Sequence, residues 1–212
     1  MTELYYKVLG RGGVACHGGY GKWLPANRWM PEIKGIVPCA RGYHLLAREQ
    51  VILWLGPEIW TADGRGEHIE QSDKHVFGQA RRLKRFRTWN ARTQRLFACD
   101  CAERVLPIFE ETHPGVGHPR ECIMVARKFA LGQATKKEMA EASSAAAAAT
   151  ASHYSSTSHG ASAAGAAYYS SIAYAPVAAT EAAYVAAASC SGSTAERVWQ
   201  TERLFEYLEG TR

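Results

Sequence analysis

Cysteine and histidine side chains make up the most metal-like set of residues in the sequence. Cys16 is followed directly by His17, and Cys39 lies five residues before His44. A structural zinc ion takes four nitrogen or sulfur ligands, usually as two closely spaced pairs. Because adjacent residues of a strand point to opposite faces, Cys16 and His17 do not reach one ion together. We therefore expect buried thiols and a hydrogen-bonded His44, with no metal and no other cofactor.

The sequence contains no recognisable catalytic motif. G-x-S-x-G, the Walker A loop and H-E-x-x-H are all absent. Gly10-Arg11-Gly12-Gly13 contains G-x-G, but no predicted helix follows it, which argues against a dinucleotide loop. We predict that the protein is not an enzyme. A cleft that gathers His44, His75 and an acidic residue would change that interpretation.

Aromatic side chains are dense in the first 60 residues and could line a ligand pocket. The set comprises Trp23, Trp29, Trp54, Trp60, Tyr20 and Tyr43. In a small domain, large rings more often form the hydrophobic core, and we favour that interpretation.

One short segment carries the whole positive excess of the chain. Residues 1–80 hold nine basic and eight acidic residues, and residues 96–212 hold nine and twelve. Residues 81–95 hold seven basic residues and no acidic one. The seven are Arg81, Arg82, Lys84, Arg85, Arg87, Arg92 and Arg95. Such a concentration indicates a local binding surface and not a diffuse basic character.

Two kinds of partner suit this basic segment. With Phe86 and Trp89 interleaved, it could contact phosphates and stack on bases of a nucleic acid. It could also bind an acidic protein surface, or pair internally with Asp100, Glu103 or acidic residues of the front domain. We favour a protein surface or internal pairing, and nucleic-acid binding stays open as the alternative.

The elements that must position these residues fall into two halves, an α+β fold. Domain 1–87 is rich in glycine and proline, which favours short strands with one helix packed on them. Strands are predicted at Leu4 to Leu9, Ile33 to Val37, Glu58 to Ala62 and about Lys74 to Phe86, and a helix at Leu45 to Leu55. Domain 88–212 is predicted to be an alanine-rich helical bundle.

Helix boundaries in the second half follow capping and breaking residues. The first predicted helix has its N-cap at Thr88 and ends before His113, and the second runs from Pro119 to Gly132. A capping box at Thr135 and Glu138 begins the third helix, and Pro176 begins the fourth. The fifth runs from Ser193 to Gly210. In the last of these, the predicted inward-facing residues are Val198, Trp199, Leu204, Phe205 and Leu208.

Residues 140–190 are unusual, because 22 of these 51 residues are alanine and ten are serine. No charged residue lies between Glu141 and Glu181, so a membrane hairpin is conceivable. Alanine and serine transfer poorly into lipid, however, and alanine has the highest helix propensity. We predict closely packed helices outside any membrane. Met1 to Gly10 contains no apolar leader segment, so we expect a cytoplasmic protein with reduced cysteines.

The second half resembles a known family. It is similar to a family of immunity proteins of bacterial polymorphic toxin systems. The residues that carry the resemblance are Trp89 to Thr93, Arg95 to Leu106, Pro119-Arg120-Glu121 and Glu196 to Leu208. The resemblance covers about residues 89–209 and implies an all-α fold and non-enzymatic binding of a toxin. The chain departs from the family pattern in having serine and tyrosine where arginine is common between the alanines.

The first half resembles a small domain of phage and prophage genomes. The residues that carry the resemblance are Cys16 to Tyr20, Cys39-x-x-Gly42-Tyr43-His44 and Asp73-Lys74. Together, the two resemblances imply an inhibitor of immunity or counter-defence type. Its expected partner is a protein such as a toxin, a nuclease or a host defence component.

Overall fold

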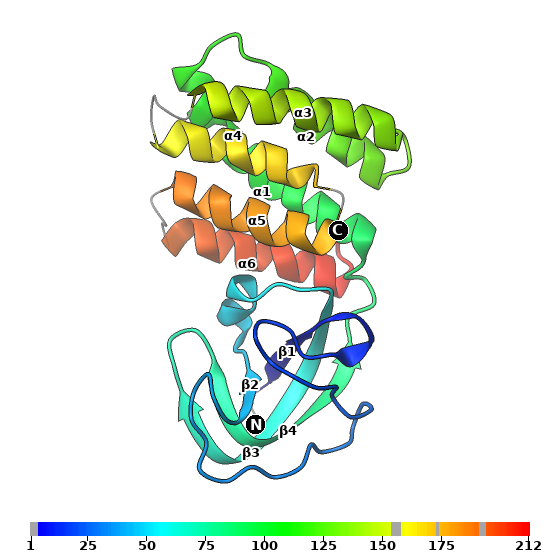
Figure 1. Ribbon diagram of the computed structural model, residues 1–212, viewed down its shortest axis with the longest axis vertical. Helices are drawn as coiled ribbons and strands as arrows, with labels where there is room; N and C mark the ends of the chain where they lie inside the picture. Colours follow the sequence, from blue (N-terminus) through cyan, green and yellow to red (C-terminus); the bar gives the residue numbers. More distant parts are fainter. Residues whose placement is uncertain (1–3, 154–157, 173, 191–193) are drawn as a thin grey trace. The chain divides into compact units, whose positions relative to one another are not determined.

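The computed structural model describes residues 4–153, 158–172, 174–190 and 194–212, without the side chains of residues 149–161 and 163. Contacts divide the chain into two compact units, Met1–Trp89 and Asn90–Arg212. The first unit contains an antiparallel sheet and the second contains helices, so the predicted α+β fold class is confirmed (Figure 1). The predicted division into domains 1–87 and 88–212 stays a prediction.

The first unit is built on a four-stranded antiparallel sheet of order β1-β3-β4-β2. The strands are β1 (Tyr5–Leu9), β2 (Tyr43–Leu45), β3 (Glu58–Glu70) and β4 (His75–Arg85). β3 and β4 form a long hairpin, with register shifts between Trp60 and Ala62 and between Arg65 and His68. The predicted strands at Leu4 to Leu9, Glu58 to Ala62 and Lys74 to Phe86 are confirmed.

One prediction in the first unit is wrong and one is confirmed in part. Ile33 to Val37 is a loop, because the Glu67 carboxylate accepts from the N–H groups of Gly35 and Ile36 and takes the place of a strand partner. The short helix predicted at Leu45 to Leu55 is present, but it is the 3₁₀ helix η2 (Arg48–Leu53), whose Gln50 side chain accepts from the N–H of Ala47 at 2.9 Å.

The hydrophobic core of the sheet unit gathers several of the predicted aromatic residues. Its buried members are Tyr5, Leu9, Trp23, Leu45, Ala62, Phe77 and Ala80, with Met30, Tyr43 and Trp60 packed against them. The prediction that the rings form a core therefore holds for Trp23, Tyr43 and Trp60. Tyr20 departs from it, because its side chain is almost fully exposed.

The second unit contains the helices α1 (Ala91–Thr112), α2 (His118–Ala130), α3 (Lys136–His153), α4 (Ser158–Ser170), α5 (Ala175–Ser189) and α6 (Thr194–Glu209). Helix α1 contacts α2, α4, α5 and α6, and its length lets it serve as their common support. Where the sequence predicted one long helix beginning at Thr135, the structure has α3 and α4. Residues 154–157 lie outside the described part.

Helix α1 begins two residues later than predicted. Asn90, and not Thr88, is the N-cap, because its Oδ1 accepts from the N–H groups of Arg92 and Thr93. Asparagine ranks above threonine at this position, so the sequence already contained the better choice. The predicted capping box of α3 is confirmed, since the N–H of Glu138 donates to Thr135 Oγ1 and the N–H of Thr135 donates to Glu138 Oε2.

Alanine side chains let α4 and α5 approach α1 closely. Ala98 of α1 forms one fully buried cluster with Ala178 and Ala182 of α5, against which Tyr169 and Ile172 pack. A residue as small as alanine brings the backbones together, and the larger side chains fill the remaining space. Within the described residues, no helix combines the length and the apolar character needed to cross a membrane.

Candidate functional site

A buried carboxylate joins three parts of the helical unit. Asp100 of α1 is only 5 % exposed. Its Oδ1 lies 2.9 Å from Arg127 Nη1 of α2, and its Oδ2 accepts from the Tyr207 hydroxyl of α6 at 2.9 Å. Arg212 Nε lies 3.2 Å from Oδ2, and Arg203 Nε lies 3.7 Å from it. Burial and the Asp100 charge raise the pKa of Tyr207, so its hydroxyl stays protonated and donates.

Ion pairs between α1 and α2 continue from Asp100 toward the surface. The second nitrogen of the Arg127 guanidinium, Nη2, lies 2.8 Å from Glu103 Oε2. Further along the helices, Arg120 forms a two-pronged pair with Glu110, at 2.7 Å and 2.6 Å. These pairs hold the two helices in register, because planar guanidinium groups bind carboxylates with a defined geometry.

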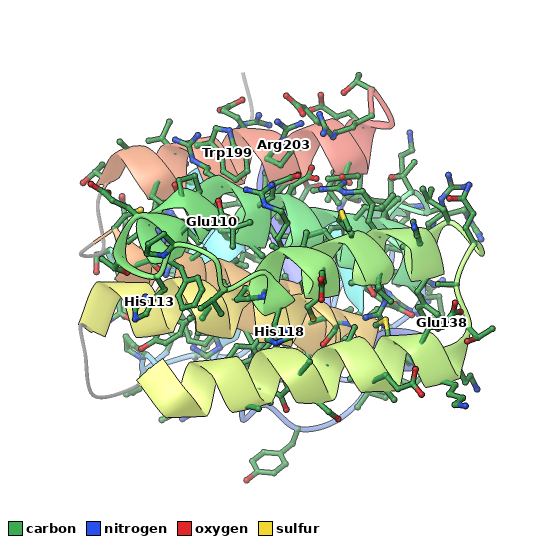
Figure 2. The ribbon with its side chains drawn as sticks, turned by 90° about the horizontal axis from the view of Figure 1, so that it is seen from above. Glu110, His113, His118, Glu138, Trp199 and Arg203 are labelled. Atoms are coloured by element: carbon green, nitrogen blue, oxygen red, sulfur yellow. The ribbon has the colours of Figure 1, made fainter. Side chains whose placement is uncertain are left out.

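A tryptophan lies between two arginines on the α1–α6 side of the unit. The guanidinium carbon of Arg104 is 4.5 Å from the Trp199 ring centroid, and that of Arg203 is 5.2 Å from it. Figure 2 shows Trp199 and Arg203 close together on α6. Arg104 Nε is held by Glu196 Oε2 at 2.7 Å, which fixes the guanidinium over the ring.

We call this surface the Trp199 face. It consists of Glu103, Arg104, Arg127, Trp199 and Arg203. The ring is half-buried, and Arg104 and Glu103 are exposed at 42 % and 58 % of their side chains. Tryptophan and arginine are the residues most often found at the centres of protein–protein interfaces. The arrangement therefore suits binding of a protein and offers no nucleophile with an adjacent base.

The Trp199 face was not predicted from the sequence. Val198 and Trp199 were both predicted to face inward, whereas Val198 is 57 % exposed and Trp199 is half-buried. Leu204, Phe205 and Leu208 are buried as predicted. The available signal was the spacing of Trp199 and Arg203, which places an arginine over a tryptophan one helical turn away.

Two histidines of the helical unit whose side chains the structure describes, His113 and His118, make local contacts. His113 stacks on Phe109 at 4.7 Å between ring centroids, and His118 Nδ1 lies 3.5 Å from Glu121 Oε2. Figure 2 shows both histidines near the connection between α1 and α2. Among the residues that the structure describes, no group of three or more histidine, cysteine or acidic side chains is placed to hold a metal ion.

Three residues of the predicted basic segment are engaged within the sheet unit. Arg81 Nη2 lies 2.7 Å from Asp63 Oδ2, and Arg85 Nη1 lies 3.2 Å from Glu58 Oε1. Arg82 is buried and its Nε donates to a backbone carbonyl oxygen at 2.8 Å. The predicted internal pairing with acidic residues of the front domain is therefore present at Arg81 and Arg85.

The other four residues of the segment differ in exposure. Arg95 is buried in the helical unit, where its Nη1 donates to the carbonyl oxygen of Ile172 at 2.6 Å. Burial lowers the pKa of Arg95. Lys84, Arg87 and Arg92 are exposed and form no ion pair within the described part of the chain. Any external partner of the segment would meet these three side chains.

Replacing Lys84, Arg87 and Arg92 with alanine tests the predicted nucleic-acid binding. Affinity that depends on phosphate contacts falls steeply with salt, and it should fall further in the triple variant. Fluorescence anisotropy with labelled DNA and RNA at two salt concentrations measures both effects. Lys34→Ala, an exposed lysine outside the segment, is the matched control. Equal affinity in the triple variant and the wild type would remove this segment as the binding surface.

The cysteine–histidine set lies around a pocket of the sheet unit. Cys16, His17, Cys39 and His44 all line a cavity of about 590 Å³. The N–H of Cys39 donates to His44 Nε2 at 3.1 Å, so the predicted hydrogen bond of His44 is confirmed. The predicted burial of the thiols is wrong here, because Cys39 is exposed and Cys16 is half-buried. Burial, followed by the charge of Lys7, lowers the pKa of His44.

His44 and His75, which would have to share one cleft to form a catalytic site, do not line the same cavity. His75 does not line this cavity; its Nδ1 lies 3.1 Å from His68 Nε2 and its ring packs edge-on against Tyr5. The cavity therefore contains His44 without His75.

Comparison with known families bears on the helical half. A family model described as "Imm-5 like putative immunity protein" matches residues 84–207, which is more than half of the chain. The chain belongs to this family. The predicted resemblance of the second half to immunity proteins is thereby confirmed, and the matched range contains every residue of the Trp199 face. Comparisons of this Imm-5 like protein with curated proteins and with solved structures give no match.

Proposed function

We propose that this Imm-5 like protein is a non-enzymatic inhibitor that binds a protein toxin, such as a nuclease, and occludes it through the Trp199 face. Family membership supports the immunity-type role. The half-buried Trp199 ring between Arg104 and Arg203 is the observation that carries the choice of surface.

Preorganisation makes this face suitable for tight binding. Ion pairs hold the arginines in place before any partner arrives, Arg104 with Glu196 and Arg203 with Glu206 at 2.9 Å. Binding therefore costs little further side-chain entropy. The face carries both charge signs, so it suits a partner with a complementary mixed surface and an apolar recess for the ring.

Replacing Trp199 with alanine is expected to weaken toxin binding by about 2 kcal/mol, roughly 30-fold, as truncation of a central interface tryptophan does. The partner is first captured from nuclease-treated host lysate, identified and purified, and its affinity is then measured by calorimetry. Tyr184→Ala on α5 is the control, because Tyr184 is a large ring with 64 % exposure outside the face. Equal affinities of the two variants would contradict the assignment of this surface, provided that circular dichroism shows both to be folded.

Occlusion and enzymatic inactivation differ in stoichiometry. An occluding inhibitor abolishes toxin activity only as its concentration approaches that of the toxin, because each molecule blocks one partner. Titration of the purified toxin with the protein should therefore give a linear loss of activity that ends at equimolar amounts. Complete inactivation by a small molar fraction would show turnover and would overturn the non-enzymatic proposal.

A phage origin and a counter-defence role form the finer part of this proposal. They are supported by the resemblance of Cys16 to Tyr20, Cys39 to His44 and Asp73-Lys74 to a phage and prophage domain. A host nuclease as the captured partner would support counter-defence, whereas a secreted toxin would restrict the role to immunity.

A further inference from the structure

The pocket of the sheet unit has a composition that the immunity-type role does not use. Its cavity of about 590 Å³ lies within the size range of small-molecule sites. Side chains of Lys7, Trp23, Arg41, Tyr43, Trp54 and Lys74 line it. The whole lining belongs to the unit Met1–Trp89, and the Trp199 face belongs to the other unit.

The charge of the lining is one-sided. Lys7, Lys22, Arg41 and Lys74 contribute four cations, and no aspartate or glutamate lines the cavity. Asp73 neutralises Lys74 from the side, with Oδ2 2.9 Å from Nζ. No ion pair joins the other three to a carboxylate in the part of the chain that the structure describes. The pocket thus holds an excess of positive charge that an anion would balance.

Lys7 is the pocket cation whose surroundings most favour a bound anion. Its half-buried ammonium donates to the His44 carbonyl oxygen at 2.8 Å and lies 4.9 Å from the Trp23 ring centroid. Burial lowers the pKa of Lys7 to about 8, so the group is still mostly charged at neutral pH. A partly dehydrated cation without a carboxylate is costly, and a bound anion would offset that cost.

Aromatic rings supply flat apolar walls around these cations. Trp54 donates through its Nε1 to the Asp73 carbonyl oxygen at 2.9 Å, and the Tyr43 hydroxyl donates to the Pro31 carbonyl oxygen at 2.7 Å. Their polar atoms are thus satisfied within the protein, which leaves the ring surfaces for apolar contact. Flat walls beside an ammonium suit a ligand that joins a planar ring to an anionic group.

Two residues with a strained backbone conformation line this pocket. His17 and Cys39 both line the cavity with left-handed φ values of 57° and 62°. Such a conformation costs non-glycine residues free energy and persists where the surroundings impose it, commonly at ligand sites.

We propose that this pocket binds a small phosphomonoester that carries an aromatic ring, such as a nucleoside monophosphate, in which a ribose joins the base to the phosphate. The phosphate lies among Lys7, Lys22 and Arg41, where its two negative charges meet the three cations. The aromatic ring of the ligand lies against the side chains of Trp54 and Tyr43. This site is independent of toxin binding.

Titration with AMP tests the proposal, with tryptophan fluorescence and calorimetry as the readouts. AMP is expected to bind saturably to one site, and adenosine and inorganic phosphate each at least about tenfold more weakly, because each lacks one half of the recognised chemistry. Lys22→Gln with Arg41→Gln should weaken AMP binding about tenfold or more without unfolding the protein, since both side chains are exposed. Lys34→Gln is the matched control outside the pocket.

Three outcomes would overturn the proposal. They are no saturable binding of AMP up to millimolar concentrations, equal affinities for AMP and adenosine, and an unchanged AMP affinity in the double variant. Trp199→Ala should leave AMP binding unchanged, so failure at the pocket and failure at the toxin-binding face are measured separately.

Discussion

Replacing Asp100 with asparagine is expected to lower the free energy of unfolding of the helical unit by about 3 kcal/mol. The substitution keeps the size of the side chain but removes the charge that Arg127, Arg203 and Arg212 share. We place the effect at the lower end of the range for a broken buried ion pair, because Arg127 and Arg212 retain partial contact with water. Urea unfolding followed by far-ultraviolet circular dichroism measures it, since the α-helices all lie in this unit.

Glu103→Gln is the control for that experiment. Glu103 pairs with the same Arg127, but its side chain is 58 % exposed, so its loss should cost less than about 1 kcal/mol. If the two substitutions had equal effects, Asp100 would not be the carboxylate that holds α1, α2 and α6 together.

Replacing Ala182 with leucine is expected to destabilise the helical unit by about 3 kcal/mol. Ala182 is fully buried, in contact with Ala98 and Ala178, where α5 lies against α1. Added methylene groups have no space there, so the helices must separate or the side chain must adopt a strained rotamer. Thermal and urea unfolding measure the loss of stability.

Ala188→Leu on the same helix isolates the packing effect. Ala188 is exposed, and leucine has nearly the same helix propensity as alanine, so the change should stay within about 0.5 kcal/mol. A small effect at both positions would mean that the alanine faces of α1 and α5 are not closely packed. Our account of the alanine-rich segment would then be wrong.

Local signals predicted much of the helical unit. The capping box at Thr135 and Glu138 forms as expected, because its hydrogen bonds join residues three apart in the chain. Glycine and proline likewise marked both ends of α2, the start of α5 and the end of α6. The predicted cap at Thr88 was wrong, and Asn90, the residue type with the higher N-cap preference, forms the cap.

Predicted elements of the sheet unit differ from the structure where residues far away in the sequence supply the hydrogen bonds. The loop at Ile33 to Val37 is held by the carboxylate of Glu67, which lies 32 residues after Gly35. The chain after Leu45 forms the 3₁₀ helix η2, and its Gln50 side chain donates to the Gln71 carbonyl oxygen. Neither contact leaves a periodic pattern in the sequence, so hydrophobic spacing predicted regular elements in both places.

The sequence by itself determined the α+β division, the helical state of the alanine-rich segment and the membership of the immunity-type family, because composition, caps and family motifs are local properties of a chain. Only the tertiary structure decided which cations remain for a partner. Arg81 meets a carboxylate 18 residues before it, and Arg95 meets a carbonyl oxygen 77 residues after it. Folding alone brings such groups together, and burial or an ion pair reduces the positive charge that a nucleic acid would meet along this segment. Other long-range contacts brought Arg104 of α1 over the Trp199 ring of α6 and gathered the cations of Lys7, Lys22 and Arg41 around one pocket.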